Sequence, residues 1–272
     1  MNISYFGSDN GRNVIFFYGV PGAPEECAFL DPCGKENNLT FICFNRFAID
    51  LSIKDEAYYQ HLADEISRLA DGKKVDIIGF SIGAFIALQT CRYLKDQVRT
   101  LHLISAAAPL EAGNFLDAMA GKRVFQLAKV YSRLVILLTY WQRLLALLSP
   151  NLLFKMLFAS AAGGDKTLTA DRQFQANITK NCSHVLLTMF KVIRGILALM
   201  CSPGQLRFQR FPVRLISGHG AGDNWSPTSM AEYLQSAIPG CVSINILDNL
   251  SHYSCLYATA PNICAQLGKT QQ

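Results

Sequence analysis

The sequence predicts a doubly wound, mostly parallel α/β sheet that carries one inserted block of helices. Short apolar runs recur along the chain, helical patterns separate them, and this alternation stops once, between residues 110 and 205. Half of the 272 residues are hydrophobic and 17% are charged, which supplies a large buried sheet and excludes a disordered chain. We therefore expect one α/β core, residues 1–109 and 206–272, with an inserted all-helical cap, residues 110–205.

Six short runs of apolar, β-branched and aromatic residues are predicted to be the strands. Continuous apolar runs are typical of parallel strands that are covered on both faces. Between them, residues 56–69 place apolar side chains at helical spacing, and residues 83–93 are rich in helix-compatible apolar residues. Strands and helices in alternation predict a parallel sheet. The predicted strands are residues 14–17, 39–44, 75–78, 101–104, 213–216 and 242–247.

The predicted cap contains helical patterns alone, separated at Ser149-Pro150 and Ala162-Gly163-Gly164. It carries eleven lysine and arginine residues against four acidic ones, and the apolar surface of residues 131–148 exceeds what one buried stripe needs. This composition indicates either an ordinary helical core with a solvated basic face, or a lid that faces an acyl pocket or a membrane surface. The predicted helices are residues 115–127, 131–148, 151–158 and 171–200.

The cysteines and the start of the chain indicate a compartment. The nine cysteines are odd in number and lack the paired spacing of zinc sites, so we expect buried free thiols in a reducing environment. The first residues have neither the basic region nor the apolar run of a signal peptide. The longest apolar stretch, residues 134–148, is interrupted by Gln142 and Arg143 and is too short to span a bilayer. The default expectation is a cytoplasmic protein.

The strongest chemical signal is Gly79-Phe80-Ser81-Ile82-Gly83, which follows a predicted strand and precedes an apolar helix. In that context a GxSxG pentapeptide forms a sharp turn that lifts the serine hydroxyl above the sheet, and the small flanking residues let strand and helix approach closely. The pentapeptide alone arises by chance in about one chain in ten of this length, so the prediction depends on the context. Ser81 is the predicted nucleophile, and a loop that only packs is the alternative.

A serine nucleophile needs a histidine base, and in this type of fold the acid and then the histidine follow the serine along the chain. Of the five histidines, His219 and His252 follow the last predicted strands. His252 lies in a polar loop at the carboxyl end of the final strand, the edge at which catalytic groups of open α/β sheets gather. We predict His252 as the base, against the alternative of a solvated surface histidine.

The acid is expected in the loop that leaves the preceding strand. Asp223 lies there and would hold the histidine by its other ring nitrogen. Asp248, close to His252 in sequence, is the alternative, although ordinary turn chemistry also explains it. The oxyanion formed on the acyl carbon needs backbone donors already in place. We predict the N–H groups of Ile82, after the nucleophile, and of Val20, in the turn after the first apolar strand.

Together these motifs resemble the α/β-hydrolase superfamily, particularly its small capped bacterial hydrolases, over nearly the whole chain. Three departures are visible: Tyr18 replaces a histidine of the oxyanion loop, residues 47–50 lack the expected proline and glycine, and Ser251 replaces a glycine before His252. None of them removes a triad side chain. The matching stretches are Tyr18–Gly22 (HGxPG), Asn45-Arg46 with Leu51-Ser52 (DRPGxGxS), Gly79–Gly83 (the elbow), Gly220–Asp223 with Pro227 (GxxDxxxP) and Ser251–Ser254 (GHxx).

The predicted function is a serine hydrolase that cleaves a carboxylic ester with an apolar acyl group through an acyl-serine intermediate. Ser81, Asp223 and His252 would form its triad, and this chemistry requires no metal or organic cofactor. We expect a small-molecule ester as substrate, no nucleic-acid partner, and a peripheral membrane contact through the cap as one alternative. An acyltransferase or peptidase on the same triad, or a non-catalytic binding protein with this fold, are the competing functions.

Overall fold

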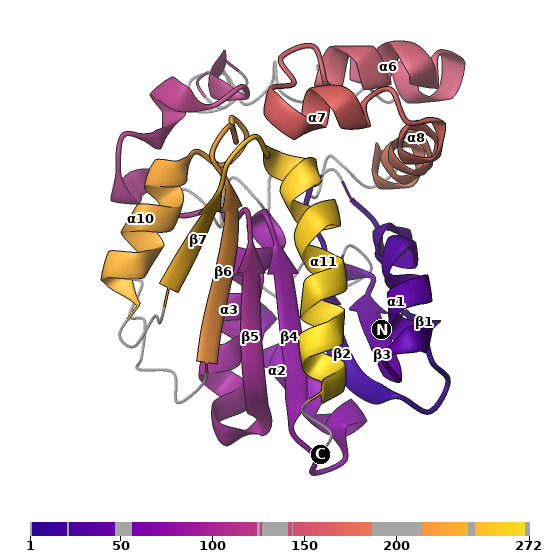
Figure 1. The fold of residues 1–272 in the computed structure, drawn as a ribbon, viewed down its shortest axis with the longest axis vertical. Coiled ribbons are helices and arrows are strands. Elements are labelled where there is room, and N and C mark those ends of the chain that lie inside the picture. Colours follow the sequence, from indigo (N-terminus) through magenta and orange to yellow (C-terminus); the bar gives the residue numbers. More distant parts are fainter. Residues whose placement is uncertain are drawn as a thin grey trace.

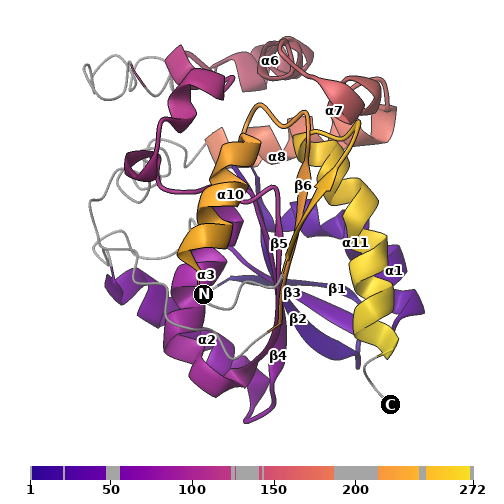
Figure 2. The same ribbon diagram turned by 60° about the vertical axis from the view of Figure 1, so that its left-hand side comes forward.

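A computed structural model describes residues 2–20, 22–46, 56–123, 126, 141–142, 144–186, 214–238 and 243–269. In this part of the chain, seven strands form one sheet in the order β1-β3-β2-β4-β5-β6-β7, with helices on both faces (Figures 1 and 2). All neighbouring strands are parallel except β1 and β3. The strands are β1 Ile3–Gly7, β2 Arg12–Phe17, β3 Leu39–Phe44, β4 Val75–Phe80, β5 Val98–Ile104, β6 Arg214–Gly220 and β7 Ser243–Leu247.

The predicted strands are confirmed by β2 to β7, and the doubly wound, mostly parallel α/β fold with them. The agreement follows from burial, because every residue of β3 and β4 is buried and both strands are mostly apolar, with Thr40 and Asp76 as their polar residues. Strand β1 is not among the strands predicted from the sequence. This edge strand is short and partly exposed, with polar Ser4 and half-exposed Tyr5, so it lacks the continuous apolar pattern of the central strands.

Two apolar layers hold the helices to the sheet. One lies between the sheet and α2 (Glu56–Ala70), α3 (Ile82–Leu94) and α10 (Thr228–Ala237). The other lies between the opposite face and the 3-10 helix Pro24–Leu30, α1 (Asp31–Glu36) and α11 (His252–Lys269). Figure 2 shows the two sets of helices on opposite sides of the strands.

Three helices lie beyond the carboxyl ends of the strands: α6 (Pro150–Leu157), α7 (Gly163–Leu168) and α8 (Arg172–Leu186) (Figure 1). Their apolar side chains, including Leu153, Phe154 and Phe174, join the apolar layer that contains α11. They therefore sit over the edge of the sheet at which β4, β6 and β7 end. The limits of the predicted cap stay a prediction, since residue 205 lies outside the described residues.

Two local predictions inside the cap are wrong. The predicted helix at 115–127 is not continuous, because a 3-10 helix covers only Phe115–Ala118 and Met119 is extended, with its neighbour Ala120 bonded through its N–H to Asn224 O at 2.7 Å. The Ala162-Gly163-Gly164 separator contains the start of α7, since α7 begins at Gly163. Of the helices predicted at 131–148 and 171–200, residues 131–140, 143 and 187–200 lie outside the described residues.

Two short 3-10 helices cover Lys95–Gln97 and Leu110–Ala112, and residues 122–123, 126, 141–142 and 144–148 are also helical. Within the described ranges, no helix is long and apolar enough to cross a membrane. The same ranges contain no cluster of three or more histidine, cysteine or acidic side chains that could hold a metal ion.

Candidate active site

Ser81 lies on the turn between β4 and α3, with backbone angles of φ 56° and ψ −127°. A positive φ is unfavourable for a residue with a side chain and persists only where the surroundings fix it. Here the Ser81 N–H donates to Ile104 O at 3.0 Å, and the Ser81 carbonyl accepts from the N–H groups of Ala84 (3.0 Å) and Ala107 (3.1 Å). The end of β5 and the start of α3 therefore hold the strained serine in place.

The glycines on either side of this turn allow the strand and the helix to approach. A methyl group built on Gly79 would lie 2.5 Å from Ala84 Cα, and one built on Gly83 would lie 2.1 Å from Phe17 O. Both contacts are with backbone-level atoms that cannot move aside cheaply, so a larger residue at either position would separate α3 from the sheet. The clearance predicted for these two glycines is present.

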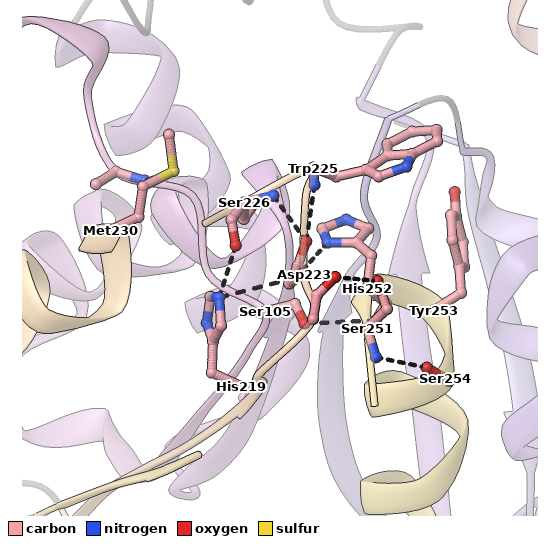
Figure 3. Close-up of polar contacts among 12 residues, drawn as sticks. Ser105, His219, Asp223, Trp225, Ser226, Met230, Ser251, His252, Tyr253 and Ser254 are labelled. Atoms are coloured by element: carbon pink, nitrogen blue, oxygen red, sulfur yellow. Dashed lines mark hydrogen bonds and ion pairs between the residues drawn. The ribbon is translucent and has the colours of Figure 1, made fainter. Parts of the chain in front are cut away.

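His252 and Asp223 are in direct contact. His252 Nδ1 lies 2.8 Å from Asp223 Oδ2, and both side chains are buried (Figure 3). The other carboxylate oxygen accepts the N–H groups of Trp225 and Ser226, each at 2.9 Å. Asp223 leaves the end of β6 and His252 begins α11, so residues 29 positions apart meet at the same sheet edge.

Asp223 remains ionised although it is buried. Burial by itself would raise its pKa, but the imidazole of His252, through its charge and hydrogen bond, outweighs that effect. His219 and the Ser226 N–H act in the same direction, so the pKa of Asp223 lies below its ordinary value. An ionised carboxylate accepts a hydrogen bond from a proton on Nδ1 of His252, which in a neutral imidazole leaves Nε2 as the nitrogen that can accept a proton.

Aromatic side chains surround the imidazole of His252. The indole of Trp225 stacks on it with ring centroids 5.5 Å apart and planes inclined by 16° (Figure 3). The Phe80 ring lies 4.7 Å away, and Phe80 is the residue directly before Ser81. The imidazole is therefore packed against the elbow and excluded from water, which strengthens its electrostatic interaction with Asp223.

The start of α11 is bonded to the helical cap. The two carboxylate oxygens of buried Asp165, on α7, accept the N–H groups of Tyr253 (3.1 Å) and Ser254 (2.6 Å). These are first-turn N–H groups, which have no partner inside the helix. In the sequence, Asp165 is only one of the four acidic residues of the predicted cap, and no local pattern links it to Tyr253, 88 positions away.

Ser251, one of the departures from the superfamily pattern, has a structural role in the same loop. Its hydroxyl donates to Gly222 O at 2.9 Å, and its N–H donates to Ser254 Oγ at 2.8 Å. The side chain that replaces glycine therefore connects the loop before His252 to the loop that carries Asp223. This substitution leaves the acid and base in contact.

The turn after β2, where Val20 lies, adjoins the elbow. A methyl group on Gly19 would lie 3.2 Å from Ser81 Cβ, so the turn and the serine are in contact. Ile82 is the first residue of α3, where N–H groups point away from the helix and stabilise negative charge. Ile82 directly follows Ser81, and Val20 directly follows Gly19; their role as oxyanion donors stays a prediction. Pro21 and residues 47–55 lie outside the described residues.

Tyr18, the second departure, forms a buried unit with Arg46. The guanidinium group of Arg46 lies 4.2 Å from the centre of the Tyr18 ring and donates to the carbonyl groups of Tyr18 and Gly19. In return, the Arg46 N–H donates to Tyr18 Oη at 3.2 Å. The tyrosine that replaces histidine therefore connects the turn to Arg46, and its hydroxyl oxygen accepts the Arg46 N–H.

Asp248 and His219, the other candidates for the acid and the base, differ from Asp223 and His252 in their contacts. Asp248 is exposed, whereas Asp223 contacts His252. His219 is buried, with Nε2 2.7 Å from Ser226 O and 3.8 Å from Asp223 Oδ2. Since a carbonyl can only accept, Nε2 carries the proton. Burial lowers the pKa of His219. His219 is therefore a neutral side chain that supports the loop carrying Asp223 and Ser226.

Solved structures with this fold cover nearly the whole chain. A bromoperoxidase from Bacillus anthracis matches 99% of this chain and 95% of its own, with a TM-score of 0.69 and 14% identity. An alpha/beta hydrolase fold protein from Nakamurella multipartita matches 98% and 93%, with a TM-score of 0.64 and 15% identity. Est816, an N-acyl homoserine lactone degrading enzyme, matches 99% and 94%, at 0.63 and 13%. These matches establish the α/β-hydrolase fold.

The fold and the elbow together define the chain as an α/β-hydrolase-type protein. Within that superfamily, the sequence model of the family described as lipid-droplet associated hydrolase matches residues 52–255, and the chain belongs to this family. The matched segment includes Ser81, Asp223 and His252. No curated protein gives a significant match.

Proposed function

We propose that the protein is a serine hydrolase that cleaves carboxylic esters with apolar acyl groups. The observation that supports this most strongly is the buried 2.8 Å contact between His252 and Asp223 beside the strained elbow of Ser81. An ionised acid, an oriented imidazole and a serine held on a strand-to-helix turn are the parts that acyl transfer to a serine requires. Membership of a hydrolase family agrees with this chemistry.

In the proposed reaction, Ser81 Oγ attacks the acyl carbon while its proton passes to Nε2 of His252. The carbonyl oxygen becomes an oxyanion, which the N–H groups of Ile82 and Val20 stabilise. Collapse of this intermediate breaks the ester bond, and the alcohol leaves with the proton from His252. Water then attacks the acyl-serine by the same route, which releases the acid and regenerates the serine.

The apolar acyl group is proposed from the aromatic side chains above the base. Phe158, directly after α6, lies 5.8 Å from Trp225 and 5.6 Å from Tyr253, measured between ring centres. Trp225 in turn stacks on His252. An acyl chain that reaches the elbow past these rings would leave water and contact hydrocarbon, which favours longer chains by about 0.8 kcal/mol for each buried methylene group.

The decisive experiment combines covalent labelling with ester hydrolysis. The wild-type protein should react with a fluorophosphonate probe, and Ser81→Ala should lose both labelling and turnover while keeping its fold. Ser236→Ala, which removes another hydroxyl far away on α10, is the matched control and should react normally. Wild-type-like turnover by Ser81→Ala would end the proposal. Absence of labelling in the wild type would favour a non-catalytic binding protein.

Two further measurements define the substrate. The value of kcat/KM should rise from acetyl esters to esters of medium chain length, and a steady decline beyond acetyl would reject the apolar acyl site. Product analysis with added alcohol and thiol acceptors distinguishes hydrolysis from acyl transfer. Free acid as the main product in the presence of acceptors supports the hydrolase.

We also propose that the cap contacts a lipid surface. Six large apolar side chains are at least 45% exposed in the segment 141–156: Trp141, Leu144, Leu147, Leu148, Leu152 and Met156. Such an exposed apolar patch is uncommon on a protein that stays dispersed in water. The cap carries a net positive charge, which attracts anionic head groups.

The lipid contact is tested with vesicles. The protein should bind vesicles of mixed phosphatidylcholine and phosphatidylserine more strongly than pure phosphatidylcholine, and salt should weaken the binding. A double variant, Leu147→Ser with Leu148→Ser, should lose this binding, while Ile246→Ser serves as the control because Ile246 is also exposed (44%) but lies on β7. Binding that ignores salt and lipid charge would reject the role of the basic cap.

A further inference from the structure

Glu26 is a buried carboxyl group behind the turn that carries Val20. Only 6% of the residue is exposed, and Oε2 accepts the N–H of Gly19 at 3.1 Å. A methyl group on Gly22 would lie 2.9 Å from the same oxygen, so the carboxyl group contacts both glycines of the turn. Among the described residues, Oε1 is buried without a hydrogen-bond partner. A buried acid with one donor requires an explanation.

The position of this bond connects Glu26 to the nucleophile. Gly19 precedes Val20, and a methyl group built on Gly19 would lie 3.2 Å from Ser81 Cβ. Because the Gly19 N–H is bonded to Glu26 on one side and the Gly19 carbonyl to Arg46 on the other, the peptide groups on both sides of Gly19 are fixed. The orientation of the next N–H, that of Val20, depends on this arrangement.

Charged and titratable groups face Glu26 from several elements. Arg46 follows β3, and His252 and Tyr257 belong to α11; Cys27 is adjacent on the same 3-10 helix. Burial raises the pKa of Glu26 to about 7, although the Gly19 N–H, Arg46 and His252 all act to lower it. The carboxyl group therefore changes charge near neutral pH.

We propose that Glu26 is a positioning residue, which in its ionised form holds the Gly19 N–H and so keeps the Val20 N–H directed at the developing oxyanion. The inference rests on the proposed function, because it assigns a partner to one of its oxyanion donors. Protonation turns the carboxylate into a weaker acceptor and removes the negative charge that faces Arg46 and His252. The turn then loses its fixed orientation and the reaction slows.

Glu26→Gln and Glu26→Ala separate this role from simple packing. Glu26→Ala leaves the Gly19 N–H without its acceptor and should lower kcat by about 10- to 100-fold with little change in KM, since the donor acts in the transition state. The amide oxygen of Glu26→Gln can accept the same bond but, like the protonated acid, carries no charge, so kcat should fall by about three- to tenfold, less than in Glu26→Ala. Glu25→Gln, on the same 3-10 helix, is the control and should behave as the wild type.

The pH dependence of kcat/KM is the distinguishing measurement. In the wild type, protonation of Glu26 should lower kcat/KM in a partial step as the pH falls through about 7. In Glu26→Gln this step should be absent. A pH profile unchanged by Glu26→Gln, or variants that lose thermal stability with no change in kcat, would overturn the inference. If the wild type neither reacts with fluorophosphonate nor cleaves esters, the proposed function itself is wrong.

Discussion

Two carboxyl groups flank the candidate nucleophile, and they are equally buried, since Asp223 and Glu26 are each 6% exposed. Asp223 accepts hydrogen bonds from Trp225 N, Ser226 N and His252 Nδ1, and its pKa lies below the ordinary value. Glu26 accepts one, from Gly19 N, and its pKa rises to about 7. At equal burial, the hydrogen-bond donors and charges around a carboxyl group therefore decide whether its pKa is lowered or raised.

The largest expected effect is the loss of kcat when Asp223 is replaced. Asp223→Asn should lower kcat by about 10³- to 10⁴-fold, because an amide can hold the imidazole in the wrong tautomer. Asp248→Asn should change kcat by less than about twofold, since Asp248 is exposed. Steady-state ester hydrolysis by the two variants gives the comparison. A greater loss in Asp248→Asn would mean that the acid has been assigned to the wrong residue.

A second prediction concerns stability and has opposite signs for the two acids. The folded protein favours protonated Glu26, so ionisation costs stability as the pH rises from 4.5, the ordinary pKa, to about 7. Glu26→Gln should therefore be more stable than the wild type above pH 7, by about 3 kcal/mol at most, and this gain should vanish near pH 4.5.

For Asp223 the linkage is reversed. Its folded pKa is lowered, so its charge contributes stability above the ordinary pKa of 3.8, and that stability is lost as the pH falls through the folded value. Asp223→Asn should therefore be less stable than the wild type at neutral pH. Urea denaturation of both variants between about pH 4.5 and 8 tests the pair. Shifts of the same sign in both would refute the contrast drawn from their donors.

The smallest expected effect on catalysis comes from His219. Its Nε2–H is bonded to Ser226 O, and it lies 3.8 Å from the Asp223 carboxylate, while His252 contacts that carboxylate directly. His219→Ala should reduce kcat by no more than about threefold, although the cavity should cost about 1–3 kcal/mol of unfolding free energy. His252→Ala, measured alongside, should be nearly as damaging as Ser81→Ala. Equal losses in the two histidine variants would make His219 part of the reaction.

The parts of the fold that the sequence predicts are those set by local patterns and chain order. Buried strands such as β3 and β4 are mostly apolar runs, and the elbow at Ser81 needs small residues on both sides. The pairing of Asp223 with His252 follows from a topological rule, because both residues leave the carboxyl ends of neighbouring strands.

The remaining features depend on tertiary contacts that no local pattern encodes. The bond from Asp165 to the first turn of α11 joins residues 88 positions apart, and Arg46 reaches Tyr18 across 28 positions. Glu26 is only seven residues from Gly19, yet its sequence context, an acidic pair after a proline, is typical of an exposed helix start. What distinguishes Glu26 is burial, which depends on how the 3-10 helix packs.

Asp165 has a consequence for any movement of α7. Its carboxylate caps the N-terminus of α11 through the N–H groups of Tyr253 and Ser254, the two residues that follow His252. A displacement of α7 would therefore break both bonds to the first turn of that helix. Thermodynamic coupling is reciprocal: if docking of α7 stabilises the catalytic orientation of His252, then a reaction intermediate that requires this orientation must stabilise the docked α7 by the same free energy. The docking equilibrium of α7 would then determine both how open the elbow at Ser81 is and whether His252 has its catalytic orientation.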